Sequence, residues 1–337
     1  MSDARAADNV ANHYSSRHNQ GKREREKSKI FGLRRLNNWV KSCLILQYAG
    51  DGGKYVLDLA CGKGGDLEKY KNAEVGYWCA VDIAPDSVRQ HARQRYNDPR
   101  SNYHFPAQLL CADAFSVDLK PHLNPVDTFD VISCQMAFHY SFATQARVEQ
   151  CLKNVSECLR PGGYFIGTTT DANVLVKKLR NVEGMAFGNE VYRVQFADRH
   201  HSKRFSNDQP FGIEYTFTLE DAVDTLPEYL VPFPVLTQIA EKYGLKLELR
   251  ANFHDFIREK MTEDVAAELM KKIGVLNPDG SEMSDDEWEA TYIYCVFAFK
   301  KMGDAKAVAA AALKKQMTPL PERRFIPEED VIIVERD

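Results

Sequence analysis

The sequence predicts an α/β fold in which a mostly parallel sheet carries helices on both faces. Short apolar strands alternate with amphipathic helices between residues 56 and 167, and this alternation is typical of parallel sheets. A glycine-rich turn follows the first of these strands. The chain has 337 residues, 44% of them hydrophobic and 27% charged. It is therefore long enough to bury a core as one large domain or two coupled ones.

The expected elements follow from the spacing of apolar residues. A helix is expected from about residue 30 to residue 44, where apolar residues recur at helical spacing. In the alternating region, strands are expected at 56–59, 77–83, 107–112, 129–134 and 164–167, and helices from Asp66, over 85–96 and over 144–159. After residue 171 the rhythm changes, and the expected elements are a helix at 173–180, a helix ending at Tyr243, and strands at 191–196, 213–219, 245–249 and 292–299. The segment beyond Lys301, with an alanine-rich helix and an acidic end, is interpreted as an appendage.

Charge is distributed unevenly along the chain. The net charge of −4 hides a local +6 over residues 1–41 and a local −3 over residues 319–337. A basic arm on a mildly acidic body is one way to bind a polyanion. The eight cysteines show no paired zinc spacing and are interpreted as reduced thiols of the core. These cysteines predict an intracellular protein without a bound metal. We also expect the protein to be soluble, because no apolar segment approaches the roughly 20 residues that span a bilayer.

The strongest chemical signal is the turn Asp58-Leu59-Ala60-Cys61-Gly62-Lys63-Gly64-Gly65-Asp66. A tight glycine turn between a parallel strand and a helix lets a ligand approach the backbone. The turn lacks the Gly-Lys-Ser/Thr ending of a phosphate loop. Asp82 and Asp113 end the next two strands, where one can accept hydrogen bonds from a ribose and the other from an adenine amino group. Either aspartate alone could equally be a helix cap, but the three features together predict an adenosine ligand.

This pattern resembles the class I methyltransferases, which often carry a turn like Pro161-Gly162-Gly163 before their fifth strand. The resemblance implies a Rossmann-like α/β fold and S-adenosylmethionine as cofactor, with S-adenosylhomocysteine as product. The sequence departs from the family at Ala60, where glycine is usual. We expect this alanine to crowd the methionine end of the cofactor rather than to exclude it.

Five further blocks narrow the resemblance to the eukaryotic mRNA cap guanine-N7 methyltransferases. In chain order they are FGLRRLNNWVK (31–41), QMAFHYSF (135–142), FGNEVY (187–192), LPEYLV (226–231) and EWEATYIY (287–294). The resemblance covers roughly residues 14–300. It implies a basic, partly flexible arm at 1–28 and a methyltransferase domain at 29–300. Within that domain we expect a cofactor-binding core at about 41–171, inserted cap-binding elements at 172–290 and a closing strand at 291–300, followed by a C-terminal extension at 301–337.

The resemblance also assigns site residues, position by position. The residues expected to hold the cofactor are Lys41, Ala60, Gly62, Asp82, Asp113, Gln135 and Tyr140. The residues expected to hold the cap are Asn37, Asn38, Lys63, Lys69, Arg95, His139, Glu228 and Tyr294. Glu228 suits guanine because a carboxylate accepts hydrogen bonds from both N1–H and the N2 amine. The three cations of the second set suit the cap triphosphate, although without the resemblance most of these side chains would be interpreted as structural.

The implied reaction is methyl transfer to guanine N7 of the cap, which converts GpppN to m7GpppN. N7 carries a lone pair and no proton, so we expect direct in-line displacement without a general base, helped by alignment and electrostatics. The implied partners are the 5′ end of capped mRNA and the transcription or capping machinery, for a monomer in the nucleus. Two alternatives stay open: a class I methyltransferase acting on another small molecule or a protein, and a cap- or RNA-binding module without catalysis.

Overall fold

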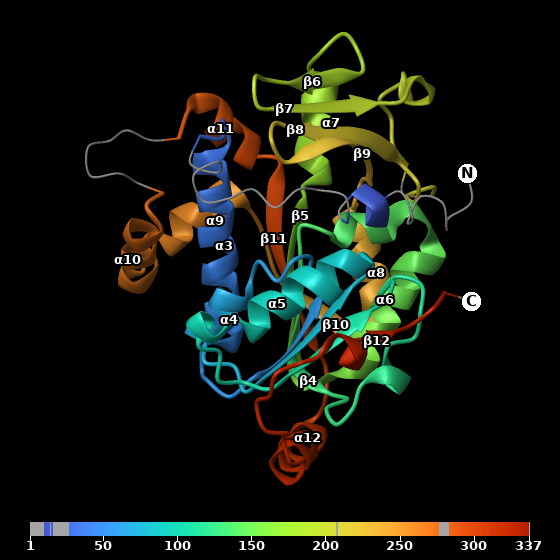
Figure 1. Cartoon of the computed structure of the whole chain (residues 1–337). Coiled ribbons are helices and arrows are strands. Elements are labelled where there is room, and N and C mark those ends of the chain that lie inside the picture. The colour runs from blue at the N-terminus through green and yellow to red at the C-terminus, as the bar shows by residue number, and fades with distance from the viewer. Residues whose placement is uncertain (1–9, 14, 16–26, 207, 276–282, 337) are drawn as a thin grey trace.

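An eight-stranded sheet forms the centre of the computed structural model, which describes residues 10–13, 15, 27–206, 208–275 and 283–336 (Figure 1). The strand order is β10-β11-β5-β4-β1-β2-β3-β12, where β12 is the short C-terminal strand Ile332–Ile333. The parallel strands at its centre are β1 (Tyr55–Leu59), β2 (Tyr77–Asp82), β3 (Ala107–Cys111), β4 (Phe129–Gln135) and β5 (Leu159–Thr170). Beside them, β11 (Tyr294–Lys301) pairs antiparallel with both β5 and β10 (Leu245–Asn252). The prediction of a mostly parallel sheet is confirmed.

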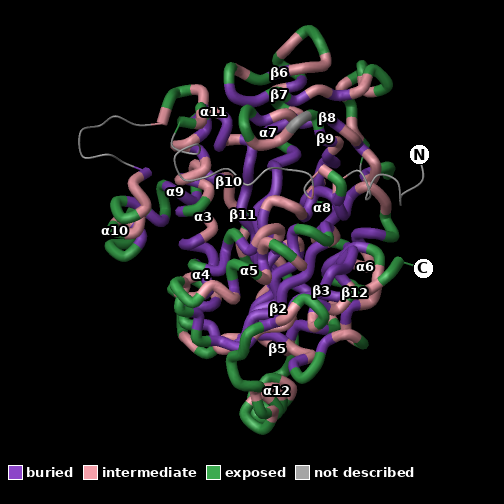
Figure 2. The backbone as a smooth tube through the Cα atoms, viewed as in Figure 1, coloured by how far each residue is buried: buried purple, intermediate pink, exposed green. Residues whose placement is uncertain are grey.

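Helices cover both faces of this sheet, so its strands are buried on each side. Every residue of β1, β2 and β4 is buried, which explains why these segments are continuous apolar runs. One face carries α3 (Phe31–Ala49), α4 (Leu67–Asn72) and a π-helical turn, η1 (Ser87–Ala92), that continues as α5 (Arg93–Asn97). The other face carries α6 (Gln145–Cys158) and α8 (Phe233–Lys242). Figure 2 shows the buried strands between these layers.

A second, four-stranded antiparallel sheet lies at the carboxyl end of the central strands (Figure 1). It follows α7 (Ala172–Arg180) and has the order β6 (Ala186–Gly188), β7 (Tyr192–Phe196), β8 (Glu214–Leu219), β9 (Val223–Tyr229). Strands β7 and β8 were expected, but β6 and β9 were not. The segment of β9 contains Pro227, which argues against a strand in a sequence analysis. Here the proline is tolerated because β9 is an edge strand.

Three short helices that the sequence analysis did not predict pack around α3. They are α9 (Phe253–Lys260), α10 (Asp264–Ile273) and α11 (Asp285–Thr291). All eight cysteines are buried and free, in agreement with their interpretation as core thiols. Within the residues that the structure describes, no helix combines the length and the apolar character needed to cross a membrane.

The C-terminal segment is not a separate appendage, which corrects the expectation from sequence. After α12 (Ala305–Met317) the chain returns to the central sheet, where β12 (Ile332–Ile333) pairs in parallel with β3. Ile326 and Val331 are buried against the body. The exposed edge of β3 offers free backbone groups to a pairing segment, but a two-residue strand in acidic surroundings leaves almost no periodic signal in a sequence.

Candidate active site

The carboxyl ends of β1 to β4 form one wall of a cavity of about 210 Å³. Because these strands are parallel neighbours, the segments that follow them meet at one edge of the sheet, as expected from the sequence. The cavity is lined by six of the seven residues assigned to the cofactor, namely Ala60, Gly62, Asp82, Asp113, Gln135 and Tyr140. Apolar neighbours, among them Ile83, Ala112 and Phe115, complete the wall.

The turn after β1 is shaped by residues in left-handed backbone conformations. Ala60 has φ 57°, and Gly62 has φ 52°. A Cβ atom added to Gly62 would meet no atom within 4 Å, so the side of this turn where a ligand would lie is open. Asp82 links this turn to the end of β2, because its carboxylate accepts hydrogen bonds from Gly62 N at 2.7 Å and from Ala84 N at 2.8 Å. Burial raises the pKa of Asp82.

Asp113 is held by an arginine that the sequence analysis did not single out. Arg147, in the first turn of α6, donates from Nη1 to Asp113 Oδ2 at 2.9 Å and from Nη2 to Oδ1 at 3.1 Å. Both residues line the cavity. With the open glycine turn, two carboxylates and apolar walls, the residues present fit an adenosyl group.

Lys41, the seventh residue assigned to the cofactor, is not among those that line the cavity. Its ammonium group lies 2.7 Å from Asp66 Oδ1, and Lys69 lies 2.8 Å from the same atom. Although burial acts in the opposite direction, these two ammonium groups hold the pKa of Asp66 well below its ordinary value. Lys41 therefore supports the start of α4, directly after the glycine turn.

Lys69, which the sequence analysis assigned to the cap phosphates, is buried. Its ammonium group also donates to Asn38 Oδ1 at 2.9 Å and to Gly65 O at 3.4 Å. The ammonium group therefore lies between Asn38, Gly65 and the carboxylate of Asp66. In this arrangement Lys69 orients Asn38, and a phosphate that bound Lys69 directly would compete with these partners.

The other residues expected to face the cap phosphates lie beside the glycine turn. Arg95 donates from Nη1 to Gly64 O at 3.2 Å. Burial lowers the pKa of His91, and the nearby charges of Lys63 and Arg95 lower it further. These groups form a local positive region. Asn37, one turn from Lys41 on α3, has a buried Oδ1 with no hydrogen-bond partner among the described residues.

The three residues assigned to the guanine lie next to the cavity and are nearly covered. His139 from η4 (Phe138–Ala143), Glu228 and Tyr294 are only 3%, 4% and 6% exposed. None of them lines the cavity, although the neighbours Tyr140, Pro227 and Tyr229 do. Access for a base therefore requires side chains to move.

Burial neutralises the ionisable pair in this region. It raises the pKa of Glu228 to about 8 and lowers the pKa of His139 to about 3. Glu228 Oε2 accepts a hydrogen bond from Tyr215 at 2.8 Å, and the Tyr215 hydroxyl lies 2.9 Å from Thr170 Oγ1 at the end of β5. Within the described chain, neither ring nitrogen of His139 makes a hydrogen bond. The cluster therefore keeps unused hydrogen-bonding capacity that a polar base edge could satisfy.

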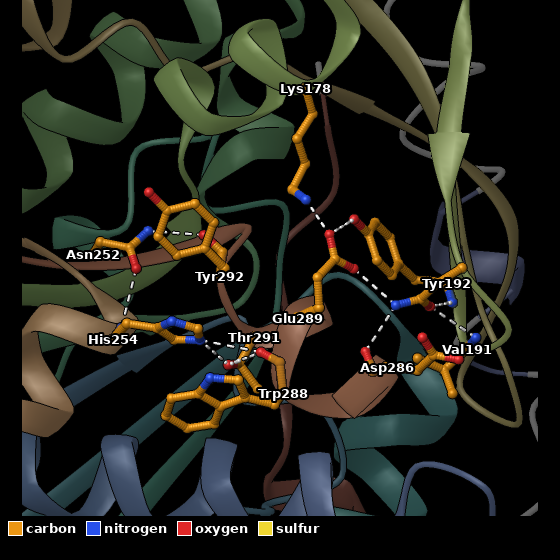
Figure 3. Close-up of polar contacts among 11 residues, drawn as sticks. Lys178, Val191, Tyr192, Asn252, His254, Asp286, Trp288, Glu289, Thr291 and Tyr292 are labelled. Atoms are coloured by element: carbon orange, nitrogen blue, oxygen red, sulfur yellow. Dashed lines mark hydrogen bonds and ion pairs between the residues drawn. The ribbon is translucent and has the colours of Figure 1, made fainter. Parts of the chain in front are cut away.

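Two of the sequence blocks meet in a structural network rather than at the cavity (Figure 3). Glu289 of α11 accepts hydrogen bonds from Lys178 of α7, from the Tyr192 hydroxyl at 3.0 Å and from Asn189 Nδ2 at 2.8 Å. Nearby, the His254 ring stacks on Trp288 with centroids 4.1 Å apart. This network ties the second sheet to α7 and α11, and so fixes the sheet that carries Glu228.

Three residues of this region were not predicted from the sequence: Arg147, Tyr215 and Val10. Val10 lines the cavity although it precedes the first expected helix by about twenty residues. Neither Arg147 nor Tyr215 belongs to a recognisable motif, and no local pattern relates either residue to its acidic partner. For Val10, the apolar residue in a polar N-terminal stretch was the only available signal.

Comparison with known proteins places this geometry in a family context. A family model described as the mRNA (guanine-N(7))-methyltransferase domain matches residues 1–302. The chain is 49% identical over 306 residues to mRNA cap guanine-N(7) methyltransferase 1 of Oryza sativa subsp. japonica, covering 88% of this chain and 82% of that protein. The corresponding protein of Arabidopsis thaliana is 47% identical, with 91% and 84% covered. The mRNA cap guanine-N(7) methyltransferase of Schizosaccharomyces pombe is 38% identical, with 88% and 83% covered.

Among solved structures, the CcbJ methyltransferase from Streptomyces caelestis has a similar fold. The TM-score is 0.50 at 13% sequence identity, and the match covers 90% of this chain and 100% of the CcbJ chain. At this identity the likeness concerns the fold alone. It agrees with a class I methyltransferase architecture.

Proposed function

The chain belongs to the mRNA (guanine-N7)-methyltransferase family, and from this membership we propose that its cavity and the adjoining cluster around Glu228 hold the cofactor and the cap guanine side by side. The enzyme transfers the methyl group of S-adenosylmethionine to N7 of the cap guanine. The observation that carries the proposal is the position of Glu228, because its neighbours in β9 line the cofactor cavity while its own carboxyl group faces His139.

The cofactor supplies an activated methyl group, and the protein supplies its placement. In this proposal Asp82 accepts hydrogen bonds from the ribose hydroxyls and Asp113 from the adenine amino group. The open side of Gly62 admits the backbone-proximal part of the ligand. Lys41 acts indirectly on the cofactor, because its ion pair with Asp66 stabilises the start of α4 after the glycine turn. Each of these contacts lowers the entropy cost of aligning the two reactants.

Glu228 has two roles in the proposal. Its carboxylate accepts hydrogen bonds from guanine N1–H and the N2 amine, a donor pair that adenine does not offer. Guanine N7 has a free lone pair, so the transfer needs no general base. As positive charge develops on the purine, the nearby carboxylate stabilises it. Because burial raises the pKa of Glu228 to about 8, its proton has to leave before the carboxylate can accept both bonds.

We place the cap phosphates near Lys63 and Arg95, beside the glycine turn, with Asn37 and Asn38 facing the cap. One chain supplies every residue in this scheme, so a monomer suffices. We also propose a nuclear location, since mRNA 5′ ends arise there. In this proposal the basic arm at 1–28, which lies mostly outside the described residues, holds RNA beyond the cap by charge.

A pair of measurements tests the proposed function. Calorimetric titration with S-adenosylhomocysteine should show binding that Asp82→Ala weakens by about 1.5–3 kcal/mol, the scale for lost charge-assisted hydrogen bonds. Methyl transfer should occur on GpppN and not on uncapped guanosine. Binding without transfer to any capped substrate would favour a cap-binding module, and transfer to another acceptor alone would favour a different methyltransferase.

A further inference from the structure

Arg147 and Asp113 form a buried, two-pronged ion pair in the wall of the cofactor cavity. The two nitrogen–oxygen distances are 2.9 and 3.1 Å, and the side chains are 9% and 3% exposed. Parallel bonds of this kind fix the plane of the carboxylate as well as its position. The pair joins the end of β3 to the start of α6, two elements that are far apart in the sequence.

The backbone around the pair limits its freedom further. Asp113 Oδ1 also accepts a hydrogen bond from Phe115 N at 3.1 Å, and Arg147 N is capped by Thr144 Oγ1 at 3.4 Å. A carboxylate has about four acceptor positions. Three of them are filled by Arg147 and Phe115, which leaves one on Oδ2 for a ligand.

We propose that Arg147 is a specificity-determining positioning residue for the cofactor base. It fixes the Asp113 carboxylate so that a single acceptor position meets a single N–H donor, which is the exocyclic amine of adenine. A base with a carbonyl at that position would place an oxygen lone pair against the carboxylate and would be rejected. The inference rests on the proposed function, because that function assigns Asp113 to the adenine.

The experiment that tests this proposal compares S-adenosylhomocysteine with S-inosylhomocysteine, in which a carbonyl replaces the exocyclic amine and the neighbouring N1 carries a proton. Their dissociation constants are measured by calorimetry on the full chain and on Arg147→Met, Arg147→Lys and Arg160→Met. Arg160→Met is the matched control, because Arg160 forms a partly buried pair with another aspartate, 2.7 Å from Asp130, and neither residue lines the cavity. The melting temperature of each variant is recorded alongside.

The wild-type protein should prefer the adenosyl ligand at least tenfold, the scale of one charge-assisted hydrogen bond. Arg147→Met should reduce this preference by about tenfold, mainly through weaker binding of the adenosyl ligand. Arg160→Met should lower stability and keep the preference. If Arg147→Met does not fold, Arg147→Lys carries the test, because lysine keeps the charge but loses the fork, so the preference should still fall.

An unchanged preference in a folded Arg147 variant would overturn the inference and leave Arg147 a structural residue. Absence of any preference in the wild-type protein would overturn the inference together with the adenine assignment of Asp113. Neither result would bear on methyl transfer to capped guanosine, because that assay tests the proposed function separately.

Discussion

His139 and Glu228 face each other across the junction of the two sheets, with Nε2 and Oε1 3.5 Å apart. His139 follows β4 of the central sheet, and Glu228 lies on β9 of the second sheet. The proposed guanine site therefore exists only where the second sheet docks on the carboxyl edge of the first. The Glu289 network, which ties the second sheet to α7 and α11, supports that docking.

Glu228 should give the stability of the protein a characteristic pH dependence. Its pKa is about 8 in the folded chain against an ordinary value of 4.5, so between these values the folded state holds a proton that the unfolded state releases. The contribution of Glu228 to the free energy of unfolding is therefore complete below pH 4.5 and is lost as the pH rises through 8. The loss is at most about 1.4 kcal/mol per pH unit.

Glu228→Gln has no carboxyl group to titrate, so its stability should not change in this way. From pH 7 to pH 8, urea unfolding should show the wild-type protein losing up to about 1 kcal/mol of stability relative to the variant. His139 does not interfere, because its folded pKa of about 3 against an ordinary 6.5 confines its effect, of opposite sign, to lower pH. Parallel pH profiles for the two proteins would show that the pKa of Glu228 is not raised.

Ala60 adopts φ 57°, a conformation that costs a non-glycine residue roughly 1–2 kcal/mol. Ala60→Gly should remove this strain, at an entropic cost of about 0.4–1 kcal/mol from the unfolded state. The expected outcome is unchanged or slightly higher stability and tighter binding of S-adenosylhomocysteine. Ala112→Gly is the control, because Ala112 lines the same cavity without a positive φ and should be destabilised. Equal destabilisation of both variants would contradict strain at Ala60.

The docked C-terminal segment should matter for stability more than for chemistry. No residue beyond Met302 is among those that line the cavity, so ending the chain at Met302 should leave methyl transfer nearly intact at low temperature. Losing the buried Ile326 and Val331 should cost about 3 kcal/mol of stability. Glu328→Gln, which removes ion pairs of a half-exposed carboxylate with Arg89 and Arg93, should cost less than about 1 kcal/mol. An unchanged melting temperature after truncation, or a large fall in activity of the folded protein, would contradict this account.

Two parts of the N-terminal arm should act differently. Val10 lines the cavity and Ala11 is buried, so deletion of residues 1–14 should weaken binding of S-adenosylhomocysteine. Replacing the basic residues of 22–29 with glutamine should spare the cofactor and a cap dinucleotide. It should weaken long capped RNA and flatten its salt dependence, because phosphate contacts release counterions. If the deletion and the glutamine replacements each weaken S-adenosylhomocysteine and long capped RNA to the same extent, the arm acts as one structural unit.

The sequence predicted the central sheet and most of the helices that cover it, but not β6, β9, β12 or the three short helices around α3. Strands β1 to β5 were predictable because buried parallel strands are continuous apolar runs. The proximity of Asp82 and Asp113 was predictable because the carboxyl ends of parallel strands meet at one edge of the sheet. Strand β9 was hidden by Pro227, and β12 is too short for a periodic pattern. These elements depend on edges of sheets that exist only after folding.

The site shows the same division. Lys69 was expected at the cap phosphates, but its ammonium group is engaged by Asp66 and Asn38, since the helix face that carries it turns inward. Arg147 lies beside an apolar stripe on α6, where a cation is normally interpreted as solvent-exposed. Its bond to Asp113 depends on the crossing of two elements, which no local pattern records.

Steady-state kinetics of Glu228→Gln with a cap analogue would show whether Glu228 recognises the guanine. Glutamine keeps the volume and an acceptor for Tyr215 but replaces one carboxylate oxygen with an amide NH2 group, a donor that would oppose a guanine donor. The mismatch and the lost charge should remove about 2–4 kcal/mol of transition-state stabilisation. The predicted result is a fall in kcat/KM for the cap of about a hundredfold or more, with the affinity for S-adenosylhomocysteine unchanged. A folded variant that methylates the cap at near wild-type efficiency would contradict the central claim that Glu228 recognises the guanine.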